Sequence, residues 1–143
     1  QILRHRSFSF QEFSQRYAPV ELKPAVPAFR RQDTKNRQNS IDDIPDTIKA
    51  EFDYKTKNLY EMATILYNEM LAAGIAKECA RDVLPLSTRT RLYMNGTLRS
   101  WLHYCDLRSG NGTQLEHKII ADQCKELIAI HFPVVYSAMW SNV

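Results

Sequence analysis

Apolar residues between positions 44 and 70 recur at helical spacing, which predicts a long amphipathic helix. Its apolar residues are Ile44, Ile48, Phe52, Leu59, Met62, Leu66 and Met70. Pro45 is expected in the first turn and Gly74 at the end. A second apolar stripe predicts another long helix with a buried face, opened by a capping box at Thr113 and Glu116. That stripe consists of Leu115, Ile119, Ile120, Cys124, Leu127 and Ile128.

Between these helices the pattern changes twice. Residues 88–94 alternate small or apolar side chains with larger polar ones, which predicts a strand. Asn95-Gly96 is expected to turn the chain, and Thr97 to open a helix that runs to about Arg108. On that helix one face should carry Arg99, His103 and Leu107, while the buried side should carry Leu98, Trp101, Leu102 and Cys105.

The remaining segments are short. Residues 76–84 predict a helix stopped by Pro85, and Pro133 marks a break after which a helix resumes. Ser9 to about Tyr17 is expected to form a short helix, because Ser9 and Glu12 have capping-box spacing. Residues 20–31 contain prolines and predict an extended edge segment, and residues 30–40 predict a polar loop. The predicted fold class is α+β: one helix-rich domain over residues 1–143, with a small antiparallel sheet.

Composition narrows the class of protein. A chain of 143 residues is long enough for one domain with a core. The net charge of +3 and pI near 8.8 suit anionic ligands, without the strong basicity of a dedicated nucleic-acid-binding protein. No apolar run has bilayer-spanning length, and the opening residues do not form a signal peptide. Three cysteines without metal spacing (Cys79, Cys105 and Cys124) suit a reducing cytoplasm, and we expect them in the core.

The densest candidate chemistry lies in residues 4–17, which begin with Arg4-His5-Arg6. Adjacent charged or chargeable groups resist burial unless an anion meets them, and guanidinium groups pair bidentately with phosphate. The run therefore predicts a site for a phosphorylated, planar ligand. Taken one at a time, the same residues also fit a solvated basic face, a helix cap and ordinary aromatic core contacts.

Three motifs occur in order along the chain. The first reads R-H-R-x-x-S-x-Q-E-x-S-x-R-Y from Arg4, the second is A-R-x-x-L-P from Ala80, and the third is R-S-W-L-H-Y-x-x-L-R-x-x-x-x-x-Q-x-E from Arg99. Together they resemble the motifs of the flavin-dependent thymidylate synthases. The resemblance implies a homotetramer that methylates C5 of deoxyuridine monophosphate (dUMP) to give dTMP. The carbon would come from methylenetetrahydrofolate and the hydride from FAD reduced by NADPH. It implies no membrane and no nucleic-acid polymer as partner.

The resemblance also implies roles for individual residues, at sites that lie between subunits. Arg108 matches the catalytic arginine beside the uracil ring, which favours ionisation at N3. The positions that match dUMP contacts are Gln1, Ile2, Leu3, Arg4, Glu12, Phe13, Ser14, Gln15, Arg16, Arg81 and Arg108. Those that match FAD contacts are Arg4, His5, Arg6, Gln11, Glu12, Thr97, Leu98, Arg99 and His103. No metal ligand and no cysteine nucleophile is implied.

The chain departs from the family pattern at three points. Gln11 and Thr97 stand where Asn is frequent in the family, and the given sequence begins at the first motif, ahead of which family members carry a further segment. We therefore expect either a fragment or a numbering that starts within a longer polypeptide. Two alternatives stay open. One is a flavin- or nucleotide-binding homologue without synthase activity, and the other is a nucleic-acid-binding module. Bound flavin would separate the second alternative from the other readings.

Overall fold

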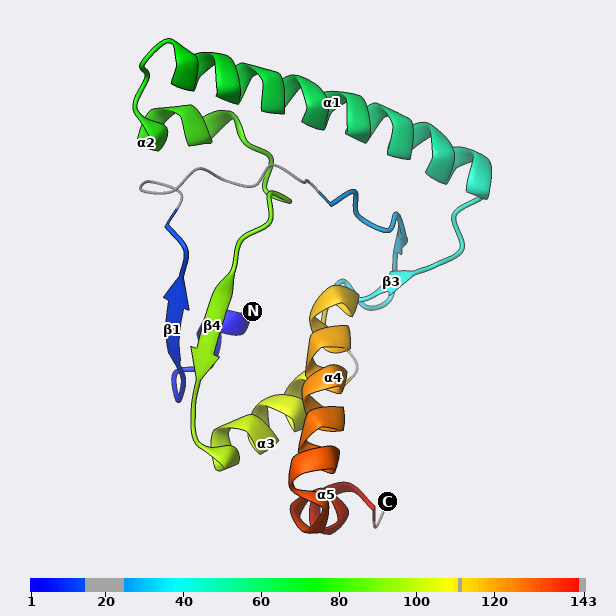
Figure 1. Cartoon of the computed structure of the whole chain (residues 1–143). Coiled ribbons are helices and arrows are strands. Elements are labelled where there is room, and N and C mark those ends of the chain that lie inside the picture. Colours follow the sequence, from blue (N-terminus) through cyan, green and yellow to red (C-terminus); the bar gives the residue numbers. More distant parts are fainter. Residues whose placement is uncertain (15–24, 111, 142–143) are drawn as a thin grey trace. The chain divides into compact units, whose positions relative to one another are not determined.

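The structure is a computed structural model that describes residues 1–14, 25–110 and 112–141. It is an α+β fold, rich in helix with two small antiparallel sheets (Figure 1). The chain divides into two compact units. The first contains residues 1–10, 32–40 and 94–143, and the second contains residues 11–31 and 41–93. Each unit is described by itself below.

Each sheet consists of two strands: β1 (Ser9–Glu12) pairs with β4 (Leu92–Asn95), and β2 (Arg31–Gln32) pairs with β3 (Ser40–Ile41). Of the strand expected over residues 88–94, positions 92–94 are confirmed, whereas positions 88–91 have no regular structure and the strand continues to Asn95, where a turn was expected. The helix expected from Ser9 is wrong, because alternation decides the structure of this segment. Phe8 is buried and Phe10 half-buried while the residues between and after them are exposed, which is the period of a strand. Residues 15–17 of that predicted helix lie outside the described residues.

The polar loop expected at residues 30–40 is closed by the β2–β3 pairing. Inside it, Asp33 Oδ1 accepts the backbone N–H groups of Lys35 and Asn36 at 2.8 and 3.2 Å. Of the extended segment expected at residues 20–31, positions 25–30 have no regular structure and positions 20–24 lie outside the described residues. The loop is therefore an Asp-centred turn between two short strands.

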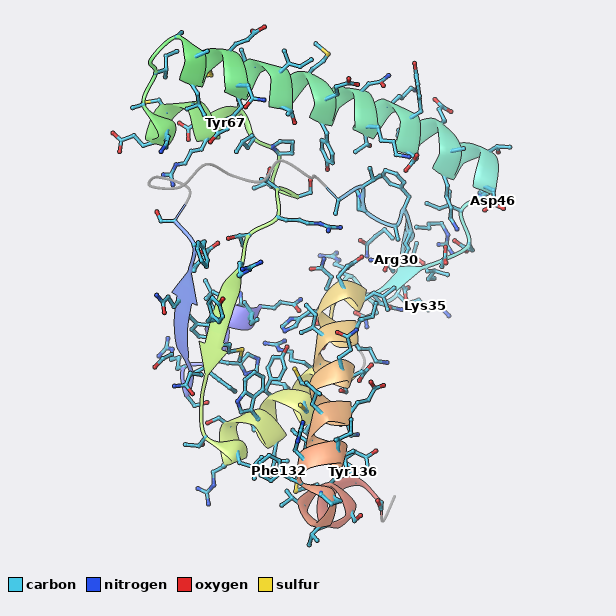
Figure 2. The ribbon with its side chains drawn as sticks, viewed as in Figure 1. Arg30, Lys35, Asp46, Tyr67, Phe132 and Tyr136 are labelled. Atoms are coloured by element: carbon cyan, nitrogen blue, oxygen red, sulfur yellow. The ribbon has the colours of Figure 1, made fainter. Side chains whose placement is uncertain are left out.

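The second unit is dominated by α1 (Asp46–Ala72), which is followed by α2 (Lys77–Ala80) and the 3₁₀ turn η2 (Arg81–Val83) (Figure 1). Gly74 follows α1 at φ +82°, so the predicted end is confirmed. Pro45 holds the N-cap position with ψ 141°, one residue before the first turn in which it was expected. Along α1 only Tyr67 is buried, and Figure 2 labels it near the end of the helix that leads to α2. Several apolar side chains of α1 stay exposed, including Leu59 at 62% and Met62 at 69%.

The first unit contains α3 (Leu98–Arg108), α4 (Leu115–His131) and α5 (Pro133–Trp140). Thr97 caps α3, since its Oγ1 accepts the Ser100 N–H at 3.3 Å, as predicted. The cap expected from Thr113 is wrong. Gln114 holds the N-cap position of α4 without a side-chain capping bond, and Gly112 makes the preceding turn at φ +89°.

The core of the first unit lies between β1, α3 and α4. Its buried members are Phe8, Tyr104, Cys105, Ala121 and Ile128. A Cβ on Gly96 would lie 2.6 Å from Phe8 Cδ1, so this position needs glycine because the Phe8 ring approaches its backbone.

The buried face of α4 is narrower than predicted. Ala121 and Ile128 are buried and Cys124 is half-buried, which defines one face at helical spacing. The prediction that the other stripe residues are buried is wrong. They lie off this face and are 43–55% exposed: Leu115, Ile119, Ile120 and Leu127. Among the cysteines, Cys105 is buried and Cys124 half-buried as expected. Cys79 is exposed at the surface of α2, so its placement in the core is wrong.

Candidate functional site

The Arg4-His5-Arg6 run divides its side chains between core and solvent. The short 3₁₀ turn η1 (Ile2–Arg4) ends at His5, whose N–H donates to the Ile2 carbonyl at 3.2 Å. His5 is buried, whereas Arg4 and Arg6 on either side of it are exposed. The residue types predict that an anion accompanies any burial in this run. The chain instead buries the one member that can be neutral.

His5 meets Arg108, from the far end of α3. Arg108 Nε donates to His5 Nε2 at 2.8 Å, and Arg108 Nη2 donates to the Gln1 carbonyl at 3.4 Å. The first and third motifs, about a hundred residues apart, therefore meet at this contact. The Nε–Nη2 edge of the guanidinium makes these bonds, so its Nη1–Nη2 end remains for a planar acceptor.

A second histidine joins the same group. His117 lies in the first turn of α4, with Nε2 at 3.0 Å from Tyr104 Oη and Nδ1 at 3.1 Å from Gln1 Oε1. Tyr104 is 1% exposed, and its ring meets the His5 ring edge-on with centroids 5.0 Å apart. Gln1, His5, Tyr104, Arg108 and His117 thus form one connected cluster, which we call the Arg108 cluster.

The titratable groups of the Arg108 cluster favour their uncharged forms. Burial, followed by the positive charge of Arg108, lowers the pKa of His5 below its ordinary value. The same two causes, in the same order, lower the pKa of His117. Burial raises the pKa of Tyr104 to about 12, so the phenol stays protonated. The fixed charge of the Arg108 guanidinium therefore lies beside two imidazoles that favour their neutral forms and a protonated phenol.

The N-terminal part of α3 carries a separate polar face. Arg99, His103 and Leu107 are exposed, and Trp101 and Cys105 turn inward, as the helical spacing predicts. Arg4, Arg6 and Arg99 therefore present guanidinium groups to solvent within the first unit. Donors of this type fit an anionic cofactor with a diphosphate, which pairs with arginine forks.

An apolar cavity of about 480 Å³ lies near this helix in the first unit. It is lined by Leu98, Trp101, Cys124, Leu127, Ile128, His131 and Phe132. Phe132 begins the turn from α4 into α5 (Figure 2). Leu98 is the one lining residue that the resemblance assigned to flavin.

The remaining predicted site residues belong to the second unit or lie outside the description. Gln11, Glu12, Phe13 and Ser14 are exposed, and the Arg91 guanidinium stands 5.9 Å from the centre of the Phe13 ring. Arg81 Nε donates to the Glu78 carbonyl at 3.3 Å. Because the two units are described separately, these residues are not brought together with the Arg108 cluster. Gln15 and Arg16 lie outside the described residues.

Sequence reasoning gave no role to Tyr104 and His117. Tyr104 stood inside the third motif, and His117 directly follows its final glutamate. Helical periodicity could not place them together, because Tyr104 is on α3 and His117 is on α4. Their positions in the sequence could have indicated a role, because Tyr104 lies inside the motif that contains Arg108 and His117 directly follows that motif.

The described residues hold no group of three or more His, Cys, Asp or Glu side chains that could bind a metal ion. Within the same ranges, no helix combines the length and apolar character that crossing a bilayer requires.

The fold and sequence match known proteins. At TM-score 0.83, the chain is similar to crystal structures of PolB, a UMP/dUMP methylase from Streptomyces cacaoi, bound with 5-Br UMP or 5-Br dUMP. Identity to these is 29% and 28%, over 96% of this chain and 66% and 64% of theirs.

Curated sequences are closer. A probable flavin-dependent thymidylate synthase of Paramecium bursaria Chlorella virus 1 and a flavin-dependent thymidylate synthase of Synechocystis are each 52% identical over 97% of this chain. The chain spans 64% of the length of each. The sequence model of a family described as thymidylate synthase complementing protein matches residues 1–134. The chain therefore belongs to this family, that of the flavin-dependent thymidylate synthases.

Proposed function

We propose that the protein synthesises thymidylate by reductive methylation of dUMP to dTMP, with methylenetetrahydrofolate as carbon donor and FAD, reduced by NADPH, as hydride carrier. The observation that carries the proposal is the contact of His5 with Arg108, which joins two of the three motifs and leaves one end of the guanidinium for a ligand. The 52% identity to named synthases supports it, as does the similarity to a methylase crystallised with uridine nucleotides.

Arg108 is the residue to which we assign the chemistry. Carbon C5 of uracil becomes nucleophilic when negative charge gathers on the N3–C4 amide, and a fixed guanidinium beside that amide stabilises the charge. Arginine suits this role because it does not give up its own proton at any working pH. The Nη1–Nη2 end of Arg108 offers two parallel donors for the polarised edge of the ring.

The other nucleotide residues would hold the phosphate and sugar. Arg81, Arg16 and Ser14 suit the phosphate, because guanidinium and hydroxyl groups are strong phosphate donors. Gln1, Ile2, Leu3, Arg4, Glu12, Phe13 and Gln15 complete the proposed dUMP set. These residues come from both units and from the part of the chain that is not described, so their assembly into one site is part of the proposal.

The proposed flavin residues are Arg4, His5, Arg6, Gln11, Glu12, Thr97, Leu98, Arg99 and His103. The exposed guanidinium groups of Arg4, Arg6 and Arg99 fit the charge of the FAD diphosphate. Bound reduced FAD would supply the hydride that completes the methyl group, while the protein binds and orients the reactants.

We further propose a cytoplasmic homotetramer with sites between subunits. The exposed apolar side chains of α1, such as Leu59 and Met62, support an association of chains that covers them. The cation-rich run at Arg4–Arg6 supports a wall completed by another subunit around an anionic ligand.

Purified full-length protein tests the proposal against its two alternatives. We expect a yellow, flavin-loaded preparation that binds dUMP and makes dTMP when methylenetetrahydrofolate and NADPH are added. Flavin and dUMP binding without dTMP would support the homologue that lacks synthase activity. A colourless preparation that binds single-stranded DNA instead would support the nucleic-acid-binding module.

A further inference from the structure

We infer that His5 and His117 are positioning residues for Arg108, and that each works as a neutral imidazole with its proton on Nδ1. The inference rests on the proposed function for its catalytic meaning, since it deepens the role of Arg108. It adds His117 and Tyr104, which the motifs left without a role. It also gives His5 a task besides any contact with flavin.

The contacts of the Arg108 cluster form a closed circuit within the first unit. Arg108 donates to His5, the His5 ring packs on Tyr104, and Tyr104 bonds His117. His117 bonds the Gln1 side chain, and the Gln1 carbonyl accepts from Arg108. A closed circuit restrains the guanidinium from two directions, so each member limits the motion of the next.

The proton positions follow from which atoms can donate. Arg108 Nε carries a hydrogen and has no acceptor capacity, so His5 Nε2 must accept, and the remaining proton of neutral His5 sits on Nδ1. Gln1 Oε1 can only accept, so His117 Nδ1 donates to it and His117 Nε2 accepts the Tyr104 hydroxyl hydrogen. Every bond in the circuit is then satisfied with both histidines neutral.

Acid breaks this arrangement at one particular bond. Protonated His5 would place an Nε2–H against the Arg108 Nε–H, two donors and two positive charges at 2.8 Å. The charged or titratable side chains acting on His5 are Arg108 and His103, both from α3, and both oppose its protonation. Arg108 should therefore lose its orientation as pH falls below the lowered pKa of His5. The Tyr104 hydroxyl can rotate to accept from protonated His117, so that bond is less sensitive to acid.

The pH profile of kcat/KM for dUMP tests the role of His5 in flavin-loaded full-length protein. We expect an acid limb below pH 6.5, the ordinary pKa of histidine, because the pKa of His5 is lowered. His5→Gln keeps an acceptor near the Nε2 position that does not titrate. This variant should lose the limb and keep activity at pH 8 within about tenfold, whereas His5→Leu should lose about 100-fold, mainly in kcat. An unchanged acid limb in His5→Gln, at equal flavin content, would overturn the role of His5.

His117 is tested by a matched set on the same helix. His117→Phe should lower kcat/KM for dUMP at least tenfold without loss of flavin, and His117→Gln should recover part of this by accepting from Tyr104. Gln123→Phe, at an exposed position of α4 outside the cavity lining, is the control and should behave like the parent protein. Equal kinetics of His117→Phe and Gln123→Phe would overturn the role of His117.

Nitrogen-15 NMR of the imidazole rings tests the proton positions without turnover. At pH 8 both rings should show the Nδ1–H tautomer, assigned by loss of their signals in His5→Gln and His117→Gln, and His5 should titrate below pH 6.5. An Nε2–H tautomer at either ring would overturn the inference. If the parent protein made no dTMP while the NMR result held, the proposed function alone would fail.

Discussion

His5 is the residue at which burial and charge conflict most directly. Burying an imidazole costs less free energy than burying a guanidinium, because the imidazole can release its proton and still accept a hydrogen bond. Arg108 Nε donates to that acceptor, so the buried His5 is paired with a cation rather than with an anion. The basic run thus separates into one structural histidine and two solvent-facing arginines, Arg4 and Arg6.

Arg108→Lys should lower kcat by on the order of 100-fold and change KM for dUMP much less. Lysine keeps the charge but cannot donate to His5 and to a planar ligand from one rigid group. Steady-state kinetics at saturating dUMP, with flavin content measured in parallel, gives the comparison. Arg89→Lys, an exposed arginine outside the proposed sites, is the matched control. Parent-like kcat in Arg108→Lys would remove Arg108 from the chemistry.

Gly96→Ala should destabilise the protein by about 1–3 kcal/mol, because the new Cβ would push the Phe8 ring out of the core. Denaturant unfolding followed by tryptophan fluorescence measures the change. Gly110→Ala is the control: its nearest heavy atom would be the Leu107 carbonyl oxygen at 3.5 Å, so a change within about 0.5 kcal/mol is expected. Equal effects of the two substitutions would show that Phe8 adapts without strain.

Among the elements, two threonines precede helices and only one caps. Thr97→Ala should cost about 1 kcal/mol, because the Ser100 N–H at the start of α3 loses its acceptor. Thr113→Ala should cost far less, since the N-cap residue of α4 is Gln114 and not Thr113. Thermal unfolding of both variants decides the matter, and a larger loss at Thr113 would contradict the observed caps.

The long helices were predictable because local signals agree with one another. Pro45, Gly74 and Thr97 mark boundaries through backbone geometry or a cap, and such effects act within a few residues. The segment from Ser9 was not predictable by the same means. A capping-box pattern and an alternating aromatic pattern compete there, and pairing with the distant strand β4 decides in favour of the strand.

Contacts between elements also limit how much of the candidate site can be predicted from the sequence. The family resemblance implies binding roles for Arg108, His5 and Gln1, and the structure brings these three residues together. Their hydrogen bonds to one another, and the contribution of His117, depend on how α4 packs against α3. The same packing buries Ala121 and Ile128 and leaves other apolar residues of α4, such as Ile119, exposed. Periodicity alone does not fix the rotation of a helix about its axis.

At the scale of the whole molecule, exposed apolar side chains and exposed guanidinium groups point to association and to anionic ligands. FAD should raise the melting temperature of the full-length protein and shift its mass towards the tetramer, because binding to the assembled state stabilises that state. The shift should be larger at low salt, where charge attraction is less screened. Sedimentation velocity with and without FAD is the measurement. A flavin-loaded, active monomer would contradict the proposal that the sites lie between subunits.

The proposed reaction transfers one carbon from methylenetetrahydrofolate to C5 of dUMP, and an isotope label on that carbon shows directly whether the transfer occurs. Full-length, flavin-loaded protein is given dUMP, NADPH and methylenetetrahydrofolate labelled with carbon-13 in its methylene group, and the nucleotide product is analysed by mass spectrometry. We expect dTMP that carries the label in its methyl group, formed only when all three substrates are present and strongly reduced in Arg108→Lys. Unlabelled dUMP recovered intact from a folded, flavin-loaded protein would contradict it.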